Sequence, residues 1–141
     1  LMKTVEPSTA RDRILSVPTV ALSPVDGAPG DGRISLTSAM RAALGRRSIR
    51  VLAHLEEGAL LVLGSVHISS RDDGQLVEVH WSVINEKGQE LGSVTQSNVV
   101  PVGTLDGSWG DLAHAVADGG ADGVVALLRE AHRWRPALKS D

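Results

Sequence analysis

Cysteine, phenylalanine and tyrosine are all absent from this chain of 141 residues. Without cysteine there is no disulfide framework, no thiolate metal site and no cysteine nucleophile. The ring-bearing residues of the Phe, Trp and Tyr class are limited to Trp81, Trp109 and Trp134. Val, Leu, Ile and Ala must therefore fill the core, which favours thin layers whose elements approach each other closely.

A basic surface is also missing, because 14 Lys and Arg stand against 17 Asp and Glu, with a formal net charge of −3. Binding to nucleic-acid backbones normally requires a basic stripe with stacking aromatic rings. The basic residues are dispersed except in segment 41–50. We therefore expect no nucleic-acid partner, and we expect Arg46 and Arg47 to complement the dipole at a helix C-terminus.

Long apolar runs are lacking as well, since no stretch approaches the roughly 20 apolar residues that cross a bilayer. The remaining composition, with 42% hydrophobic and 22% charged residues, is that of an ordinary globular protein. The length fits one domain. We expect a flexible tether over residues 1–12, a single α/β domain over 13–135 and a flexible tail over 136–141.

Hydrophobic periodicity and turn residues together predict seven elements. The predicted strands are 19–23, 49–53, 59–70, 75–84 and 89–100, and the predicted helices are 33–46 and 109–133. The order is strand, helix, strand, three-stranded meander and helix. This order indicates the α+β class, as a two-layer α/β sandwich in which two helices pack on one face of a mixed sheet of about five strands.

Four residues mark the predicted ends of the helices. Asp31 is placed to cap the first helix, because a short side-chain oxygen can accept a hydrogen bond from the free N–H groups of the first turn. Ser108 with Asp111 three residues later resembles a capping box for the second helix. Pro136 is expected to end that helix, because proline has no N–H to donate.

The Asp73–Gly74 pair predicts a hairpin between the two longest strands. Either Asp72 or Ser70 can face Gln75, and both registers give the same division of side chains between the two faces. The predicted core face carries Val62, Val66, Ile68, Val77, Val79, Trp81 and Val83. The opposite face carries Ser65, His67, Ser69, Glu78, His80 and Ser82.

Glycines inside predicted elements raise two further expectations. Gly92 is expected to mark a bulge in the last strand, which would shift its alternation. Gly120 and Gly123 lie on or beside the buried face of the last helix, where each costs stability relative to alanine. Either a close approach of the helix to the sheet or a kink accounts for them.

The segment from Ser97 to Val116 is interpreted as the joint between the last strand and the last helix. Asn98 ends the strand, and Trp109 anchors the first helical turn by burying its ring. A partner-binding loop is the main alternative, because a tryptophan near a helix N-terminus also suits an exposed hot spot.

The chain contains no strong sequence motif for phosphate binding, nucleophilic catalysis or metal binding. The glycine-rich turn 26–32 has neither the ending of a P-loop nor the spacing of a dinucleotide fingerprint, and no Gly-x-Ser-x-Gly sequence occurs. His67, Glu78 and His80 share one sheet face, and one register sets His67 opposite His80, which suggests a zinc site without a fourth ligand. We predict no catalytic residue, no cofactor and no metal, so the chain is not expected to be an enzyme.

The outer sheet face is more apolar than a solvated face requires, which favours an interaction surface. The expected partner is an envelope protein or a second copy of the chain. The predicted interaction residues are Trp109, Asn98, Leu61, Leu63, His67, His80 and Ile84. The alternative is a small-ligand or metal-binding domain or enzyme that uses turn 26–32 or the His67/His80 pair.

Two resemblances follow from longer phrases of the sequence. The stretch "ALLVLGSVHISSRDDGQLVEVHWSVINEKGQELG" with its closing helix resembles the amino-terminal domain of TolB and related envelope lipoproteins. The phrases "TQSNVVPVGTLDGSWGD" and "AVADGGADGVVALL" resemble a family of small proteobacterial lipoproteins without an assigned activity. The resemblance implies a periplasmic binding domain, held at the outer membrane by a lipid on a cysteine upstream of Leu1, with no catalytic residue to carry over.

Overall fold

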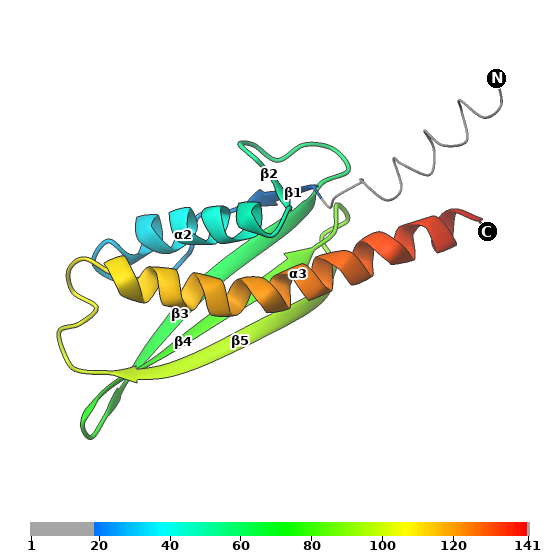
Figure 1. The fold of residues 1–141 in the computed structure, drawn as a ribbon. Coiled ribbons are helices and arrows are strands. Elements are labelled where there is room, and N and C mark those ends of the chain that lie inside the picture. Colours follow the sequence, from blue (N-terminus) through cyan, green and yellow to red (C-terminus); the bar gives the residue numbers. More distant parts are fainter. Residues whose placement is uncertain (1–18, 141) are drawn as a thin grey trace.

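The computed structural model describes the backbone of residues 19–140 and the side chains of residues 19–131 (Figure 1). The predicted tether over 1–12 lies outside the described residues. All seven predicted elements are present, in the predicted order. Their bounds are β1 Thr19–Leu22, α2 Gly32–Arg46, β2 Arg50–Leu52, β3 Leu60–Arg71, β4 Gly74–Ile84, β5 Glu90–Val100 and α3 Gly110–Ser140.

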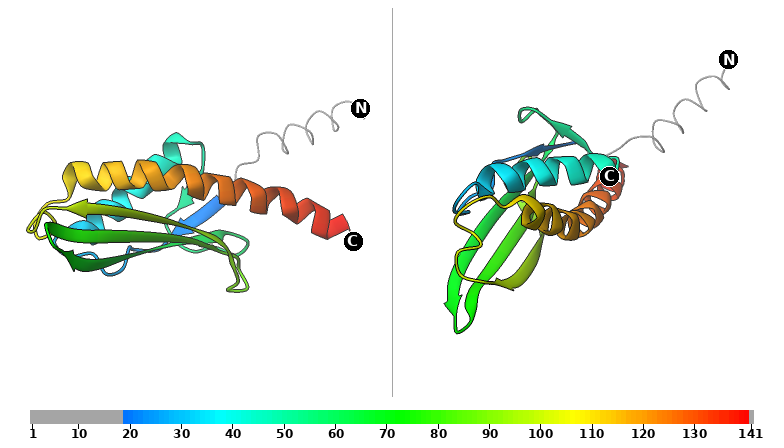
Figure 2. Two further views of the ribbon diagram at one scale, coloured as in Figure 1. Left: turned by 90° about the horizontal axis from the view of Figure 1, so that it is seen from below. Right: turned by 60° about the vertical axis from the view of Figure 1, so that its left-hand side comes forward.

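The five strands form one mixed sheet in the order β2-β1-β3-β4-β5. β1 pairs in parallel with both β2 and β3, whereas β3, β4 and β5 form an antiparallel meander. Both helices lie side by side on one face of this sheet (Figures 1 and 2). The predicted α+β two-layer sandwich is therefore confirmed.

Helix α3 continues through Pro136 to Ser140, so the helix end predicted at Pro136 is wrong. A proline inside a helix removes one backbone donor, but the flanking residues can continue the helical path.

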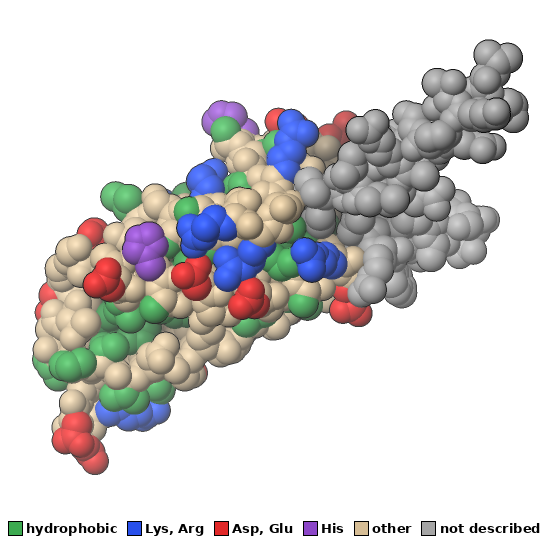
Figure 3. Space-filling model, viewed as in Figure 1, with side chains coloured by type: hydrophobic (Ala, Val, Ile, Leu, Met, Phe, Trp, Pro, Cys, Tyr) green, Lys and Arg blue, Asp and Glu red, His purple; other side chains and the backbone are tan. Residues whose placement is uncertain are grey.

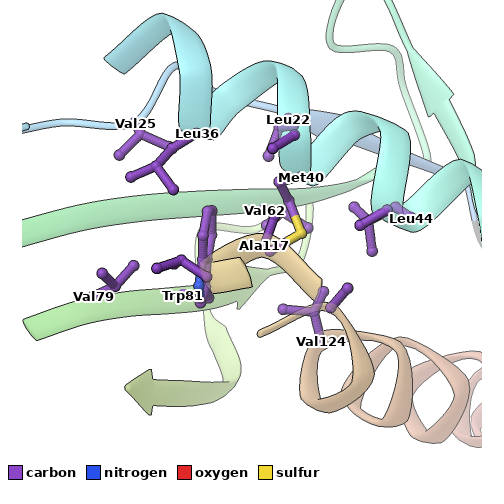
Figure 4. Close-up of a cluster of buried hydrophobic side chains, with 14 of the residues drawn as sticks. Leu22, Val25, Leu36, Met40, Leu44, Val62, Val79, Trp81, Ala117 and Val124 are labelled. Carbon is purple, nitrogen blue, oxygen red and sulfur yellow. The ribbon is translucent and has the colours of Figure 1, made fainter. Parts of the chain in front are cut away.

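The alternation of the long hairpin places its apolar residues under the helices, as predicted. Val66, Val79 and Trp81 are buried, with exposed fractions of 4%, 1% and 0%. Figure 4 shows Met40 of α2 and Val124 of α3 in the same cluster as Trp81. One core therefore lies between the sheet and the two helices.

The ring of Trp81 occupies space that glycines leave open on both sides. A Cβ atom at Gly64, its cross-strand partner, would lie 2.6 Å from the ring atom Cζ3, and one at Gly120 would lie 2.6 Å from Nε1. A Cβ atom at Gly123 would lie 2.7 Å from Val94 Cγ2. The contacts of α3 thus confirm the close approach to the sheet that Gly120 and Gly123 were expected to allow.

Gln96 provides the polar partner that this close approach requires. The indole N–H of Trp81 donates to Gln96 Oε1 at 2.9 Å, and Gln96 Nε2 donates to the Val116 carbonyl oxygen at 3.1 Å. A buried indole N–H without an acceptor would cost stability. The two hydrogen bonds satisfy this donor and also tie β5 to the backbone of α3.

The bulge predicted near Gly92 is present. Val83 pairs with Gly92, but Ile84 pairs with Glu90, so Leu91 is the extra residue of β5. A Cβ atom at Gly92 would lie 2.5 Å from Leu127 Cδ2, so the glycine also admits a side chain of α3.

Two glycine-to-alanine substitutions should change stability in opposite directions. Gly120→Ala should lower the free energy of unfolding by about 1–3 kcal/mol, because the new methyl group overlaps Trp81 and Gln96. Gly45→Ala, at an exposed position of α2 with nothing within 4 Å of the added Cβ, should raise it by about 1 kcal/mol. Urea denaturation measures both changes, and equal effects of the two variants would contradict the close packing of α3.

Candidate functional site

The outer face of the sheet, opposite the two helices, carries an apolar row at one end. The row runs in register across four neighbouring strands, with Leu52 on β2, Ala21 on β1, Leu61 on β3 and Ile84 on β4. Leu52, Leu61 and Ile84 are half-buried, and Leu63 beside them is 37% exposed. Three of the predicted interaction residues, Leu61, Leu63 and Ile84, are therefore brought together.

The middle of the outer face is polar. Ser65 pairs with His80, and His67 pairs with Glu78. His80 Nδ1 lies 2.8 Å from Thr95 Oγ1, so one ring nitrogen of His80 already has a hydrogen-bond partner on β5. Of the two registers left open, the one in which Ser70 faces Gln75 is confirmed, and the one that sets His67 opposite His80 is wrong.

The reason for this register lies in the turn. Arg71 pairs with Gly74, so the two-residue turn is Asp72–Asp73 and not the predicted Asp73–Gly74. A Cβ atom at Gly74 would collide with the Val100 carbonyl oxygen. Gly74 is therefore needed for the close contact with the end of β5. The prediction placed the turn one residue too late because it interpreted this glycine as a turn residue.

A metal site gains no support from this geometry. Among the described residues, no three His, Asp or Glu side chains gather closely enough to hold an ion. The pairing of His67 with Glu78 and the contact of His80 with Thr95 are ordinary cross-strand contacts.

The glycine-rich turn 26–32 packs against backbone carbonyl groups. The Asp26 carbonyl oxygen accepts a hydrogen bond from Val66 N at 2.8 Å, which extends the sheet beyond β1. A Cβ atom at Gly30 would lie 2.7 Å from the Leu105 carbonyl oxygen. A phosphate site requires free N–H groups, whereas oxygens surround this turn. The turn therefore acts as a joint.

Trp109 is buried at the joint between β5 and α3, with 2% of its surface exposed. Its indole N–H donates to the Leu105 carbonyl oxygen at 3.1 Å, and its backbone N–H donates to Asp31 Oδ1 at 2.8 Å. A Cβ atom at Gly32 would lie 2.6 Å from its ring. This placement supports the interpretation of Trp109 as an anchor and leaves its ring inaccessible to a partner.

Of the two predicted caps, the N-cap position of Asp31 is confirmed, whereas the capping box of Ser108 with Asp111 is absent among the described residues. The Asp31 side chain makes no capping hydrogen bond to α2, although the residue does occupy the N-cap position. In the described part of the chain, Ser108 makes no hydrogen bond to the first turn of α3. Asp31 instead binds the residue just before α3. A carboxylate from the start of one helix thus fixes the start of the other.

The remaining predicted interaction residue, Asn98, is exposed and pairs with Val77. Val77 belongs to the core-facing set, so Asn98 and the buried Trp109 do not share the outer face with Leu61, Leu63 and Ile84. The structure therefore separates the predicted residues into two groups.

The paired arginines lie on the helix face. Arg46 and Asp118 form an ion pair at 2.7 Å, and Arg47 Nε lies 2.8 Å from Asp122 Oδ1. Arg47 Nη1 also donates to the Ala43 carbonyl oxygen at 2.9 Å, in the last turn of α2 as expected. The hydrogen bond to Asp122 raises the pKa of Arg47 above its usual value. On this face, basic and acidic side chains are interspersed (Figure 3).

A groove of about 580 Å³ was not indicated by the sequence. It lies between the start of β3, the β4–β5 turn and α3, which are three segments far apart in the chain. Leu60, Leu91 and Leu127 contribute apolar lining, and the charged lining comes from Glu86, Lys87, Glu90 and Glu130.

Comparison with known proteins finds solved structures with a similar fold but no similar sequence. No protein-family model and no curated protein sequence matches the chain. A PelC dodecamer from Paraburkholderia phytofirmans matches with 17% identity and a TM-score of 0.50, covering 79% of this chain and 88% of that chain. This match shows a shared fold.

Two other solved structures belong to the classes that the sequence resembles. TolB from Acinetobacter baumannii matches with 18% identity and a TM-score of 0.41, covering 72% of this chain and 27% of that chain. A lipoprotein from Neisseria meningitidis matches with 14% identity and a TM-score of 0.45, covering 72% of this chain and 94% of that chain. A TolB protein and a bacterial lipoprotein are therefore among the solved structures to which this chain is similar. Within the described residues, no helix is long and apolar enough to span a bilayer.

The hydrogen bond from the Trp109 backbone N–H to the Asp31 carboxylate should contribute to the free energy of unfolding. Asp31→Ala should lower the free energy of unfolding by about 1–3 kcal/mol, because the Trp109 N–H loses a charged acceptor. Asp106→Ala removes an exposed carboxylate from the same joint and should have little effect. Urea denaturation of both variants tests this, and equal losses would show that Asp31 does not hold the joint.

Proposed function

We propose that the chain is a non-enzymatic domain of the bacterial cell envelope that binds a protein partner, or a second copy of itself, through the outer sheet face. The observation that supports the proposal is that helices cover one face of the sheet and leave an apolar row on the other. Helices α2 and α3 occupy one face, and an apolar row ending at Ile84 crosses the other.

The chemistry of this face suits docking. Leu61, Leu63 and Ile84 offer an apolar patch, and burial of such side chains provides most of the affinity in protein interfaces. The polar residues beside them, including His67 and His80, form a rim that can set orientation. Trp109 and Asn98, which were also expected to contribute, lie elsewhere.

Assembly of this fold is supported by the matched PelC structure, which is described as a dodecamer. Self-association of the present chain is therefore one form of the proposal, and an unlike envelope protein is the other. A periplasmic location with a lipid anchor at the outer membrane belongs to the same proposal and rests on the resemblance to lipoproteins.

A small-ligand function is the second candidate, and the groove beside Leu60 and Leu127 favours it. Its volume is within the range of ligand pockets. The His67/His80 face offers less support, because the two rings are not paired.

Leu63→Asp should abolish binding of the natural partner, because it puts a charge into the apolar patch. The matched control is Leu55→Asp, which changes a leucine that is 64% exposed in the β2–β3 loop. Crosslinking in envelope extract should give the same crosslinked species for the unchanged chain and Leu55→Asp, and none for Leu63→Asp. Loss of that species in both variants, or in neither, would contradict docking through this patch.

A thermal-shift screen separates the two candidate functions. The proposal predicts a change of less than about 1 °C with zinc, magnesium or nucleotides, because a ligand stabilises a protein only when it binds the folded state. A rise of several degrees would support the ligand-binding candidate. Loss of that rise in Leu127→Asp would locate the ligand in the groove, whereas loss in His80→Ala would locate it on the outer face.

A further inference from the structure

The two edges of the sheet differ in length and charge. β2 has three residues and begins with Arg50, whereas β5 has eleven residues, and Leu91 to Val100 carry no charge. Edge strands are normally protected by short length, lysine, proline or a bulge, because their free N–H and C=O groups invite another strand. Beyond β5 no strand follows among the described residues.

The protective features of β5 lie at its two ends. The bulge at Leu91 is at the start of the strand, and Pro101 follows the last residue, Val100. Between them, the nine residues 92–100 form a continuous strand without charge or proline. The bulge and the proline therefore leave the backbone edge of residues 92–100 accessible to another strand, and they set the two ends of the segment that can pair.

β5 is also held rigidly from inside. It pairs with β4 from Glu90 to Val100, apart from the bulge residue Leu91. On the helix face, the Gln96 side chain bonds to Trp81 and to the Val116 carbonyl, and Val94 lies against the glycine face of α3. The free edge therefore needs little ordering before a second strand binds, which lowers the entropic cost of pairing.

We propose that β5 pairs antiparallel with β5 of a second copy of this chain, so that two five-stranded sheets join into one. The midpoint of residues 92–100 is Gln96, and pairing about this residue uses all nine. Thr95 of one copy then faces Ser97 of the other, and cross-strand hydroxyl pairs of this kind stabilise sheets. The single charge of the strand, Glu90, falls outside the paired segment.

A second copy fits this edge better than an unrelated peptide. Recognition of a foreign strand draws its specificity from pockets or charges beside the edge. The exposed residues Ser93, Thr95 and Ser97 offer small hydroxyl groups. A two-fold pairing also closes on itself, because each copy uses its β5 edge once. Among the described residues, the short β2 edge and the part of β3 beyond the Asp26–Ser65 bridge stay free. This arrangement protects the long edge without open-ended growth.

The pairing would extend the outer face across both copies. The apolar patch of each copy would then lie on one continuous sheet surface. This inference rests on the proposed function in one respect, namely that self-association is part of how the domain works.

Sedimentation measurements with charge variants test the pairing. The unchanged chain should reach a mass twice the 14.8 kDa of one chain. Thr95→Lys with Ser97→Lys should raise the dissociation constant by at least about tenfold, because the ammonium groups face each other across the two-fold axis. The control, Ser69→Lys with Ser70→Lys, adds the same charge to exposed positions at the hairpin end of β3, which β4 separates from β5, and should leave the dimer intact.

Disulfide formation provides a second measurement that does not depend on charge. Because the chain contains no cysteine, any disulfide between introduced cysteines links two copies. A mixture of Thr95→Cys and Ser97→Cys chains should form the mixed disulfide faster than either chain alone, since the proposed register brings these positions together. An equal mixture of Ser69→Cys and Ser70→Cys chains is the control and should form none above background.

Three results would overturn the inference. One is a single-chain mass at concentrations up to about 1 mM, the range in which weak specific binding is still seen. Another is a dimer that the β5 lysines leave unchanged and Leu63→Asp dissociates, which would keep the proposed function and reject the edge. The third is equal crosslinking in the β5 and β3 cysteine mixtures.

Discussion

The packing of Trp81 between two glycines is the constraint on which the rest of the structure depends. Its ring contacts the position of Gly64 on β3 and that of Gly120 on α3, so any side chain at either place would force the layers apart. In a core without Phe or Tyr, this ring fills the space that several smaller residues would otherwise have to fill. Its N–H group finds an acceptor in Gln96, which draws β5 into the same contact.

Close packing on one side of the sheet decides what the other side can do. Helices α2 and α3 both pack over Trp81 and its neighbours, and within residues 19–140 no third layer covers the opposite face. The apolar row through Leu61 and Ile84 and the uncharged edge of β5 are therefore the surfaces through which we propose association. The groove beside α3 is a separate feature and belongs to the second candidate function.

Features that local periodicity determines were predictable from the sequence, and features that a distant partner determines were not. The alternation of β3 and β4 predicted which side chains are buried. Asp31 has the expected residue type for a cap, but its carboxylate binds Trp109, 78 positions away. Gly74 was interpreted as a turn residue, although contact with Val100 explains it. Gln96 gave no signal, because its role depends on the position of Trp81 beneath α3.

If the helix face is closed and the chain associates through its remaining surfaces, concentration should change the solvent protection of β5 above all. Hydrogen exchange of the backbone amides, compared between dilute and concentrated protein, measures this protection. Amides of β5 should exchange more slowly in concentrated protein, whereas those of α2 and of α3 up to residue 131 should be unchanged. Unchanged exchange in β5, or slowing confined to the two helices, would contradict this expectation.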